Sequence, residues 1–489
     1  MATIVANITP LHTAESVTGA VGNKPVLDNE IFKQGSNSIG FTVTQNKVSG
    51  LSFASVDLTG EHVRLWYTST TFPNMDIKAN GGLRFYIKGG GTTAYWNIAG
   101  KDTYFGGWLN IVVDVDSTPD SGSFTKTAVT EIGVEITTVT TPRNAVNTWI
   151  DYARYGDGLT AYGTPSFSME DIYQADLAGG YGIVEKNEGV YILTGSIIIG
   201  DAASTNATIF EEDGTVYVFA DKNVSATLYK LEGVGNATGD TDISFDNCVI
   251  TSAGPIYDLD FNSADIESVA ISGCQISGAD EILLDTLCTI LGTTFNACGL
   301  ITVEAATVED CTVSNPTGSI ALKYPAAIAN NNTARITFID STAGTYAIEI
   351  STDVDHTFDG HKFTGGWTAH VHNTSGQAII VYATNGCTAS TFTGTTDIQN
   401  SVILTIKGMV EGSVISICRV GTTTSEAYVA SSAANGEYEF TYNYPTGWNV
   451  DIVVHKNEYR YVEILNYPLT ANPVTVPITQ VEDRQFGNP

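Results

Sequence analysis

The sequence predicts an all-β protein in which a coil-by-coil parallel β-solenoid lies between two sandwich-like parts. Short alternating or continuously apolar runs, bounded by Gly, Asn, Asp or Thr, dominate the chain, and amphipathic helix patterns are scarce. A hydrophobic fraction of 43%, with 23 Tyr and 19 Phe, supplies a large core and argues against a disordered chain. The texture of the runs changes near residues 165 and 400, which divides the chain into three parts.

The charge balance narrows the possible functions. The chain has 53 acidic and 22 basic residues, a net charge of −31. This argues against a nucleic-acid binder, which needs a basic surface, and disfavours adhesion to an anionic membrane. No run of about 18 apolar residues occurs, so no transmembrane helix is expected. The N-terminal MATIVANITPLHTAES lacks the basic start and apolar core of a signal peptide, and we expect assembly in a reducing cytoplasm.

The cysteines fit that compartment. They are Cys248, Cys274, Cys288, Cys298, Cys311, Cys387 and Cys418. Their number is odd, and no Cys-x-x-Cys metal spacing occurs among them. The sequence therefore predicts small buried thiols rather than a zinc site or a disulfide framework.

Residues 1–165 contain long and aromatic predicted strands, such as HVRLWYTST, LRFYIKG and WLNIVVDVD. Gly-rich or Asp-rich turns between them suit an antiparallel sandwich. In HVRLWYTST, Leu65 and Tyr67 alternate with Arg64 and Trp66, so one face would be buried and the other available. The order of these strands resembles the jelly-roll sandwiches of laminin-G-like and carbohydrate-binding modules, over about a third of the chain.

Residues 166–188 form the predicted connection, with a short helical piece, and residues 189–400 contain a repeat that ends in a small side chain. Its copies are Asp-Asn-Cys248, Ser-Gly-Cys274, Leu-Gly-Thr293 and Glu-Asp-Cys311, with looser ones at Ile-Asp-Ser341 and Asp-Gly-His361. A second short strand follows each copy. Two or three short strands in a period of about 20 residues predict a parallel β-solenoid, whose stacked coils share one core. The cysteines are then rungs of an internal ladder.

The repeat is similar to the right-handed parallel β-helices of the pectate-lyase type, which tailed-bacteriophage tailspikes and fibres use, often as trimers. Residues 401–489 contain alternating strands with hairpin turns and resemble the small immunoglobulin-like or transthyretin-like sandwiches attached to many phage and secreted proteins. The closing NPVTVPITQVEDRQFGNP resembles the extended tails that end some phage virion proteins. Together these resemblances imply a fibre, spike or decoration protein on a virion surface.

An enzyme is the main alternative, because pectate-lyase-like architectures host polysaccharide lyases and glycoside hydrolases. Hydrolysis needs two carboxyl groups flanking the scissile bond. The candidates on the predicted second strands are Asp258, Asp260, Asp285, Glu304 and Glu349. Asp258 and Asp260 would share an outward face of one strand. A solvated outer face of an acidic protein also explains them, and a lyase would need bases that this region nearly lacks, so we expect no enzymatic activity.

Two metal sites are weighed against simpler explanations. His370 and His372 are two residues apart on a strand, face the same way and could ligate a metal, although exposed histidines beside Trp367 are the favoured explanation. The acidic turns of the N-terminal part are at Asp114, Asp116, Asp120 and Asp157. Clustered carboxylates could hold a structural calcium, but Asp is also a common turn residue. No other cofactor is expected.

Five aromatic residues of the N-terminal part could stack on sugar rings, namely Trp66, Trp96, Trp108, Trp149 and Tyr155. Because tryptophan usually enters a sandwich core, most of them should be structural. Trp66 is the exception, since Leu65 and Tyr67 fit the opposite face of its strand. Trp66 and Tyr155 are therefore the predicted ligand-binding residues.

These resemblances imply a structural virion protein of a tailed phage, acting as a homotrimeric decoration, fibre or spike subunit. The expected partners are further copies of the chain, other virion proteins of head or tail, and a host-surface glycan held by multivalent contacts. A tailspike polysaccharide depolymerase is the alternative, and a bacterial surface adhesin, weakened by the lack of a signal sequence, is a third. An outward carboxylate pair in a groove would favour the enzyme, whereas a smooth outer face would favour the structural protein.

Overall fold

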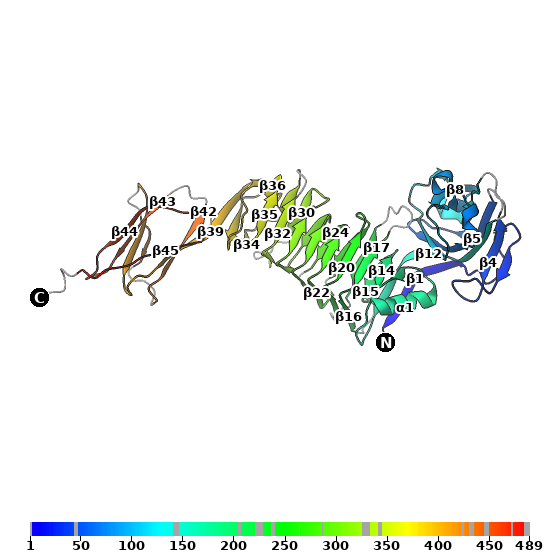
Figure 1. Cartoon of the computed structure of the whole chain (residues 1–489), viewed down its shortest axis with the longest axis horizontal. Helices are drawn as coiled ribbons and strands as arrows, with labels where there is room; N and C mark the ends of the chain where they lie inside the picture. The colour runs from blue at the N-terminus through cyan, green and yellow to red at the C-terminus, as the bar shows by residue number, and fades with distance from the viewer. Residues whose placement is uncertain are drawn as a thin grey trace. The chain divides into compact units, whose positions relative to one another are not determined.

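The computed structural model describes residues 2–43, 47–139, 146–203, 207–220, 228–235, 240–263, 265–285, 287–324, 333–340, 345–421, 425–429, 435–444, 449–470 and 473–483. Within these ranges the chain is all-β, as predicted, with one α-helix, α1 (Met169–Gly179) (Figure 1). It forms two compact units. Unit 1 comprises residues 1–289 and 293–301, and unit 2 comprises residues 290–292 and 302–489.

Unit 1 begins with a sandwich of two sheets. One sheet has the order β10-β8-β7-β11-β5-β2, and the facing sheet contains β3, β4, β6, β9 and β12. The bounds are β1 (Thr3–His12), β2 (Ala20–Gly22), β3 (Val26–Asp28), β4 (Ser38–Val43), β5 (Lys47–Val56), β6 (His62–Ser69), β7 (Leu83–Gly89), β8 (Thr92–Ala99), β9 (Leu109–Asp114), β10 (Ser121–Gly122), β11 (Val129–Ile136) and β12 (Val146–Tyr162). Inward residues of both sheets, such as Leu65, Phe85 and Ile132, form one buried core.

Strand β12 joins the sandwich to the parallel ladders that follow. Its first half lies antiparallel to β4 and to β6. Its second half pairs antiparallel with β1 and parallel with β15 (Ser196–Ile199), so it is an edge of neither arrangement. Because one hydrogen-bonded strand runs through the join, the sandwich is held directly to the first coil.

Three parallel ladders follow in unit 1. They run through β15, β18, β21 and β24; through β14, β17, β20, β23 and β26; and through β16, β19 and β22. The bounds are β13 (Val184–Asn187), β14 (Val190–Leu193), β16 (Thr208–Asp213), β17 (Val216–Phe219), β18 (Tyr229–Gly233), β19 (Thr241–Asp246), β20 (Val249–Ser252), β21 (Tyr257–Phe261), β22 (Ser268–Ser272), β23 (Gln275–Ser277), β24 (Ala279–Leu284), β25 (Cys288–Leu291), β26 (Thr294–Asn296) and β27 (Leu300–Val303). Strands three apart in the sequence are thus neighbours, which makes a coil of three strands.

A residue in the left-handed backbone region precedes the side chain at this repeated position in each coil. These residues are Asn247 (φ 52°), Gly273 (φ 63°), Gly292 (φ 59°), Asp310 (φ 55°), Arg335 (φ 54°) and Gly360 (φ 66°). Gly, Asn and Asp tolerate this conformation best, which explains why they occupy most of the corners. At Arg335 the side chain forms ion pairs of 2.6 Å with both Glu309 and Asp310, which hold the corner.

The cysteines of unit 1 lie inside the coils. The backbone N–H of Cys248 lies 3.3 Å from the Sγ atom of Cys274, and the N–H of Thr294 donates to the carbonyl of Cys274 at 2.9 Å. Cys248, Cys274 and Thr293 are therefore successive rungs of one ladder. All seven cysteines are free thiols, and all except Cys418 are buried, which confirms the prediction of small buried thiols.

Unit 2 corrects the predicted ladder beyond Cys311. The register places Thr312 opposite Thr337 and Thr337 opposite Lys362. The residues before them, Cys311, Ile336 and His361, therefore share one position. The predicted copy at Ser341 is wrong, because Ile336 fills that rung, and Ser341 itself lies outside the described residues. The copy at Ile336 could not be recognised from the sequence, because the corner residue before it is an arginine rather than Gly, Asn or Asp.

Unit 2 contains its own parallel ladders and a C-terminal sandwich-like part. The ladder bounds are β28 (Thr307–Glu309), β29 (Thr312–Ser314), β30 (Ile320–Tyr324), β31 (Thr333–Ala334), β32 (Thr337–Asp340), β33 (Tyr346–Ile350), β34 (His356–Asp359), β35 (Lys362–Gly365), β36 (Ala369–Asn373), β37 (Ile379–Thr384) and β38 (Phe392–Thr393). The long strand β39 (Thr396–Lys407) pairs parallel with β37 and antiparallel with β42 (Tyr438–Tyr444). A shared strand thus joins ladders and sandwich here as well.

The remaining C-terminal strands form a sheet of order β41-β40-β43-β44. Their bounds are β40 (Val414–Arg419), β41 (Ser425–Val429), β43 (Asn449–His455) and β44 (Val462–Pro468), and β45 (Val474–Pro477) pairs with β39. Leu404, Ile417 and Ile452 belong to the buried core of this part. Residues 484–489, the end of the predicted tail, lie outside the described residues.

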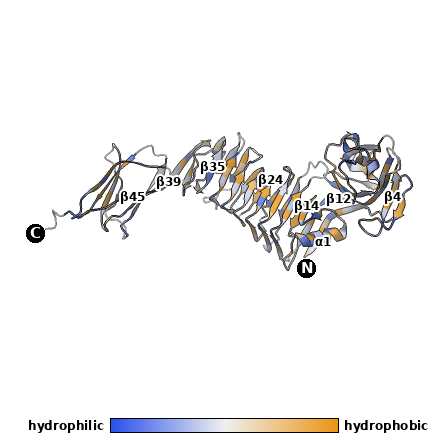
Figure 2. Cartoon of the chain, in the orientation of Figure 1, coloured by the Kyte–Doolittle hydropathy of each residue, from blue (hydrophilic) through white to orange (hydrophobic). Residues whose placement is uncertain are grey.

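Apolar and polar residues alternate along many of the strands, as Figure 2 shows, with the apolar ones turned inward in the ladders. In the part of the chain that the structure describes, no helix has the length and apolar character needed to span a membrane.

Candidate functional site

The outer face of β6 carries residues on which the candidate site is built. Leu65 and Tyr67 point into the sandwich core, as predicted, and Arg64 and Trp66 lie on the opposite face. That face is covered, because Trp66 is 3% exposed and Arg64 is 0% exposed. The prediction of an exposed Trp66 is therefore wrong. The segment from α1 to β13 packs over this face, and its carbonyl groups accept hydrogen bonds from both side chains.

The guanidinium group of Arg64 binds this segment to the sandwich. Its Nε donates to the carbonyl of Gly156 at 3.1 Å, and one Nη donates to the carbonyl of Gly182 at 3.1 Å. The other Nη donates to the carbonyl of Thr194. Burial lowers the pKa of Arg64. A buried guanidinium is tolerated only when its donors are satisfied, so these bonds fix three chain segments around one side chain.

Arg154 of β12 likewise binds the segment after α1 to the sandwich. Its Nε donates to the carbonyl of Tyr181 at 2.7 Å, and its Nη atoms donate to the carbonyl of Tyr152 at 2.8 Å and to Oδ1 of Asn110 at 3.1 Å. Burial, together with the neighbouring Arg64, lowers the pKa of Arg154 to about 9. Neither arginine was assigned a role from the sequence, because their carbonyl partners are distant in the chain.

Helix α1 supplies an acidic group, Asp176, beside these two arginines. Ser168 and Asp171 form a capping box that starts the helix. Near its end Asp176 is buried, and its carboxylate accepts the N–H groups of Gly182 and Ile183, each at 3.1 Å. Burial raises the pKa of Asp176 to about 6, and the two buried guanidinium groups oppose this effect. The turn after α1 is therefore held from both sides.

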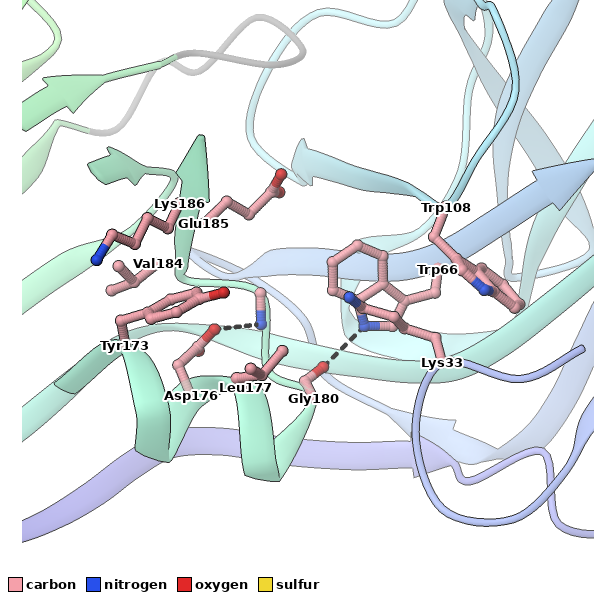
Figure 3. Close-up of a pocket in the computed structure, with 11 residues that line it drawn as sticks. Lys33, Trp66, Trp108, Tyr173, Asp176, Leu177, Gly180, Val184, Glu185 and Lys186 are labelled. Carbon is pink, nitrogen blue, oxygen red and sulfur yellow. Dashed lines mark hydrogen bonds between the residues drawn. The ribbon is translucent and has the colours of Figure 1, made fainter. Parts of the chain in front are cut away.

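A cavity of about 150 Å³ lies where this segment meets the sandwich (Figure 3). It is lined by Lys33, Trp66, Trp108, Tyr173, Asp176, Leu177, Gly180, Gly182, Val184, Glu185 and Lys186. The indole N–H of Trp66 donates to the carbonyl of Gly180 at 2.8 Å. The Nζ of Lys33 lies 4.7 Å from the centre of the Trp66 ring, within range of a cation–π interaction. Aromatic and charged groups thus converge on one small space.

The side of the cavity nearest α1 is a fixed network. Lys186 forms an ion pair with Glu170 at 2.5 Å, and the hydroxyl of Tyr191 donates to the same carboxylate at 2.6 Å. These hydrogen bonds lower the pKa of Glu170 to about 2. The Lys186 ammonium also lies 5.9 Å from the centre of the Tyr173 ring.

The loop that carries Lys33 is held by carboxylates. Asp151 accepts the backbone N–H groups of Lys33 at 2.8 Å and Gln34 at 2.9 Å. Glu15 accepts the N–H of Ser36 at 2.8 Å. Burial raises the pKa of Asp151 to about 6. Because its backbone is anchored at these points, the loop keeps the Lys33 side chain beside Trp66.

The other predicted aromatic residues lie elsewhere, with one exception. Tyr155 packs against the sandwich core and does not line the cavity, and Trp96 lies inside that core. Trp149 donates its indole N–H to Asp28 at 2.8 Å. Trp108, which the sequence analysis grouped with the structural tryptophans, lines the cavity. Its position after two glycines, at the very start of a strand, was the signal for a partly exposed ring.

The carboxylates proposed for an enzyme share an outer face but each has a partner. Asp258 and Asp260 alternate with the buried residues of β21, as predicted. Asp260 forms an ion pair with Lys230 at 3.2 Å, and Asp258 accepts the backbone N–H of Glu281 at 3.1 Å. Burial raises the pKa of Asp258. This arrangement is a charged outer face of the ladder on which Lys230 supplies a positive charge.

The remaining carboxylate candidates are dispersed. Asp285 follows β24 in unit 1, where its side chain is half-buried. Glu304 is half-buried in unit 2, and Glu349 of the same unit forms an ion pair with Lys323 at 2.9 Å.

The predicted histidine pair stacks on aromatic rings in unit 2. His370 lies on Phe363 with ring centres 4.6 Å apart, and His372 lies on Tyr346 at 4.0 Å. The Nδ1 of His372 also makes a 2.6 Å hydrogen bond with the hydroxyl of Thr393. Both histidines point to the same side of β36 and are half-buried, so packing alone accounts for them.

The acidic turns of the N-terminal part are occupied by the protein's own groups. Asp114 is buried and accepts the backbone N–H of Asp116 at 2.7 Å, and Asp116 forms an ion pair with Lys126 at 2.6 Å. Asp120 accepts the N–H of Asn97 at 2.6 Å, and Asp157 is half-buried on β12. Among the described residues, no group of three or more His, Cys, Asp or Glu side chains could hold a metal ion.

A second hollow, of about 380 Å³, lies in the C-terminal part of unit 2. It is lined by His455, Lys456, Asn457, Glu458, Tyr459, Arg460, Tyr461 and Asp483. Tyr461 is 66% exposed, and its ring stacks on His455 with centres 4.6 Å apart. This pair is an exposed aromatic platform outside unit 1.

No family model matches the sequence, and no curated protein matches it. Among solved structures, similar chains are carbohydrate-binding modules with β-sandwich folds. One, from a study of the promiscuous specificity of such modules, is 12% identical with a TM-score of 0.21, and the match covers 32% of this chain and 56% of that chain. A family 29 module is 14% identical with a TM-score of 0.20, over 32% and 91% of the two chains.

The family 11 module of a cellulosomal cellulase of Clostridium thermocellum is 13% identical with a TM-score of 0.21, over 31% of this chain and 95% of that chain. The match to the first of these modules spans little more than half of that module's length. At such identities and TM-scores the likeness carries no argument about function, which rests on the geometry of the cavity.

Proposed function

We propose that this protein is a non-catalytic attachment protein that binds glycans in the cavity of unit 1. The observation that carries the proposal is the convergence of Trp66, Trp108 and Tyr173 on one cavity, together with the charged groups of Lys33 and Glu185. Aromatic faces suit the apolar faces of sugar rings, and a few placed polar groups orient a ligand. A cavity of about 150 Å³ suits one sugar unit of a chain rather than an extended segment.

The buried arginines support this proposal because they make the cavity rigid. Arg64 and Arg154 hold the segment after α1, which forms one wall, against the sheet that carries Trp66. Asp151 holds the loop of Lys33. A preorganised cavity loses less conformational freedom on binding, which favours recognition of a small ligand.

The wider role in this proposal is the one that the sequence resemblance implies. The protein would be a homotrimeric decoration, fibre or spike subunit on the virion surface of a tailed phage, in contact with other virion proteins. Its parts would be a jelly roll (1–165), a connection (166–188), a right-handed parallel β-helix (189–400) and a small immunoglobulin-like or transthyretin-like sandwich (401–489). The parallel ladders and the net charge of −31 support a surface protein whose weak sites gain strength through avidity.

A depolymerase is the second candidate, and one observation favours it. Asp258 and Asp260 lie together on the outer face of β21, and burial raises the pKa of Asp258, as a general acid requires. The ion pair of Asp260 with Lys230 weighs against this function, because it occupies the second carboxylate.

Glycan binding is tested with the full chain and Trp108→Ala. Affinity electrophoresis against a panel of bacterial polysaccharides should show retardation of the wild type, lost in the variant because one wall of the cavity is removed. Phe105→Ala is the matched control, since this ring lies three residues away and is 79% exposed but does not line the cavity. Tyr461→Ala reports on the C-terminal platform. Binding that survives Trp108→Ala but not Tyr461→Ala would move the site to unit 2.

The assembly and the enzyme are tested on the same preparation. Light scattering should give the mass of three chains, and incubation with the panel should release no reducing ends. Release of ends that Asp258→Asn or Asp285→Asn abolishes would establish the depolymerase instead. A monomer that binds and cuts nothing would contradict both proposed functions.

A further inference from the structure

The hydrogen-bond acceptors that line the cavity already have partners within the protein, whereas several of the donors have none in the part of the chain that the structure describes. The carbonyl of Gly180 accepts from Trp66, and that of Gly182 accepts from Arg64 at 3.1 Å and Asn110 at 2.6 Å. The carboxylate of Asp176 accepts two backbone N–H groups.

The acidic side chains around the cavity follow the same pattern. Glu185 accepts a hydrogen bond from the amide of Asn110 at 3.4 Å. Glu170 is neutralised by Lys186 and Tyr191. Each of these acidic groups, like the carbonyls of Gly180 and Gly182, therefore already accepts hydrogen bonds from the protein.

The donors of the cavity show the opposite situation. Within the described residues, the Lys33 ammonium contacts only the face of the Trp66 ring and has no carboxylate partner. The indole N–H of Trp108 and the hydroxyl of Tyr173 likewise have no protein hydrogen bond among those residues, and both rings line the cavity. Lys33 therefore brings to the cavity wall a positive charge without a carboxylate partner in the described part of the chain.

The charge behind the cavity points the same way. Arg64 and Arg154 are fully buried beside it and bind carbonyl groups, so their hydrogen bonds bring no neutralising charge. Asp176 and Asp151 are acidic groups buried near them, and both carboxylates accept backbone N–H groups. Lys33 adds a third positive charge at the cavity itself, in a partly buried position where charge–charge attraction is stronger than in water.

We propose that the sugar bound in this cavity is acidic, and that Lys33 binds its negatively charged substituent while the rings of Trp108 and Tyr173 contact the sugar. This inference rests on the proposed glycan binding and specifies its substrate class. A carboxylate or sulfate offers only acceptors, which matches the uncommitted donors of Lys33, Trp108 and Tyr173. A neutral sugar presents hydroxyl donors for which the cavity has few uncommitted acceptors.

The test compares matched ligands on the full chain by calorimetry. The ligands are a uronic-acid oligosaccharide, the same oligosaccharide with its carboxylates reduced to hydroxymethyl groups, and a sulfated derivative of the reduced form. We expect at least one acidic form to bind about tenfold more tightly than the reduced form, with an affinity that falls as salt is added. The carboxylated and sulfated arms identify which substituent is recognised.

Lys33→Gln should remove this preference, so that the acidic and reduced forms bind the variant with equal affinity. Lys24→Gln is the control, because it changes the net charge equally at an exposed lysine that does not line the cavity. Equal binding of acidic and reduced forms by the wild type, lost in Trp108→Ala, would overturn the acidic preference and keep the glycan site. A preference that persists in Lys33→Gln would overturn the role of Lys33. Failure of every ligand and of the polysaccharide panel would overturn the glycan site as well.

Discussion

Strands β6 and β21 both alternate inward and outward side chains, but only the outward side chains of β6 are covered by another segment of the chain. On each, apolar residues point inward and charged or aromatic residues point outward. The outward Arg64 and Trp66 of β6 are buried under the segment that follows α1. The outward Asp258 and Asp260 of β21 remain half-buried at the surface. Alternation therefore shows which side chains share a face, but not whether another part of the chain covers that face.

The outward charged groups of the two strands also bind different kinds of partner. Arg64 donates to carbonyl groups of distant segments, so its charge holds two parts of unit 1 together. Asp260 pairs with Lys230, which lies on the adjacent strand of the same ladder. A buried charge that binds backbone should be costly to remove, whereas a surface pair should contribute little.

The largest expected effect is that of Arg154→Met. Loss of the guanidinium leaves buried carbonyl groups of Tyr152 and Tyr181 without donors, so unit 1 should lose about 3–5 kcal/mol of unfolding free energy. Chemical denaturation followed by fluorescence measures this. Arg335→Met removes ion pairs at the surface, which solvent screens, and should cost much less than Arg154→Met. Equal costs in the two variants would show that the junction does not depend on buried charge.

A smaller effect is expected at the corners of the coils. Gly273 has φ 63°, and a Cβ atom there would lie 2.8 Å from Oδ1 of Asn247. Gly273→Val should cost about 1–2 kcal/mol, because a β-branched residue is strained in the left-handed region. Asn247→Gly at the preceding corner should leave stability nearly unchanged, as measured by thermal unfolding. A tolerated valine would mean that the corner can change its conformation.

The unfolding free energy of unit 1 should depend on pH through the titration of Asp176. Its pKa is raised to about 6 by burial, so between about pH 4 and 6 the folded state holds a proton that the unfolded state has released. This contribution to stability is present at low pH and is lost as the pH rises through 6. The slope is at most about 1.4 kcal/mol per pH unit. Comparing denaturation at pH 5 and 7, Asp176→Asn should show less loss than the wild type. An identical loss in both proteins would assign the effect to another group, such as Asp151.

The smallest effect is expected on the outer face of β21. Asp258→Asn should change stability by no more than about 0.5 kcal/mol, in the stabilising direction at neutral pH. The reason is that burial raises the pKa of Asp258, so its charged form is disfavoured, while the amide oxygen can still accept the N–H of Glu281. Differential scanning calorimetry measures this. A large destabilisation would show that this carboxylate has a structural role that the neighbouring Asp260 lacks.

The cavity was only partly predictable from the sequence. Alternation placed Trp66 opposite Leu65 and Tyr67, which is correct because a strand has a period of two. It could not show that α1 and the turn after it cover that face. Trp108 was missed and Tyr155 was assigned in its place, since both are aromatic residues in or beside a predicted strand and only three-dimensional packing separates them.

The ladder shows where local chemistry suffices. The left-handed corners need Gly, Asn or Asp, and the space inside stacked coils favours small apolar side chains, so Cys248, Cys274 and Cys311 were recognised as rungs from sequence alone. Ile336 was not recognised as a rung, because the left-handed corner before it is Arg335, which ion pairs stabilise there. The all-β class, the buried thiols and the inward faces follow from such short-range rules. The burial of Arg64 and Arg154 and the shape of the cavity do not, because carbonyl partners far along the chain become neighbours only when the sandwich and the first coil meet.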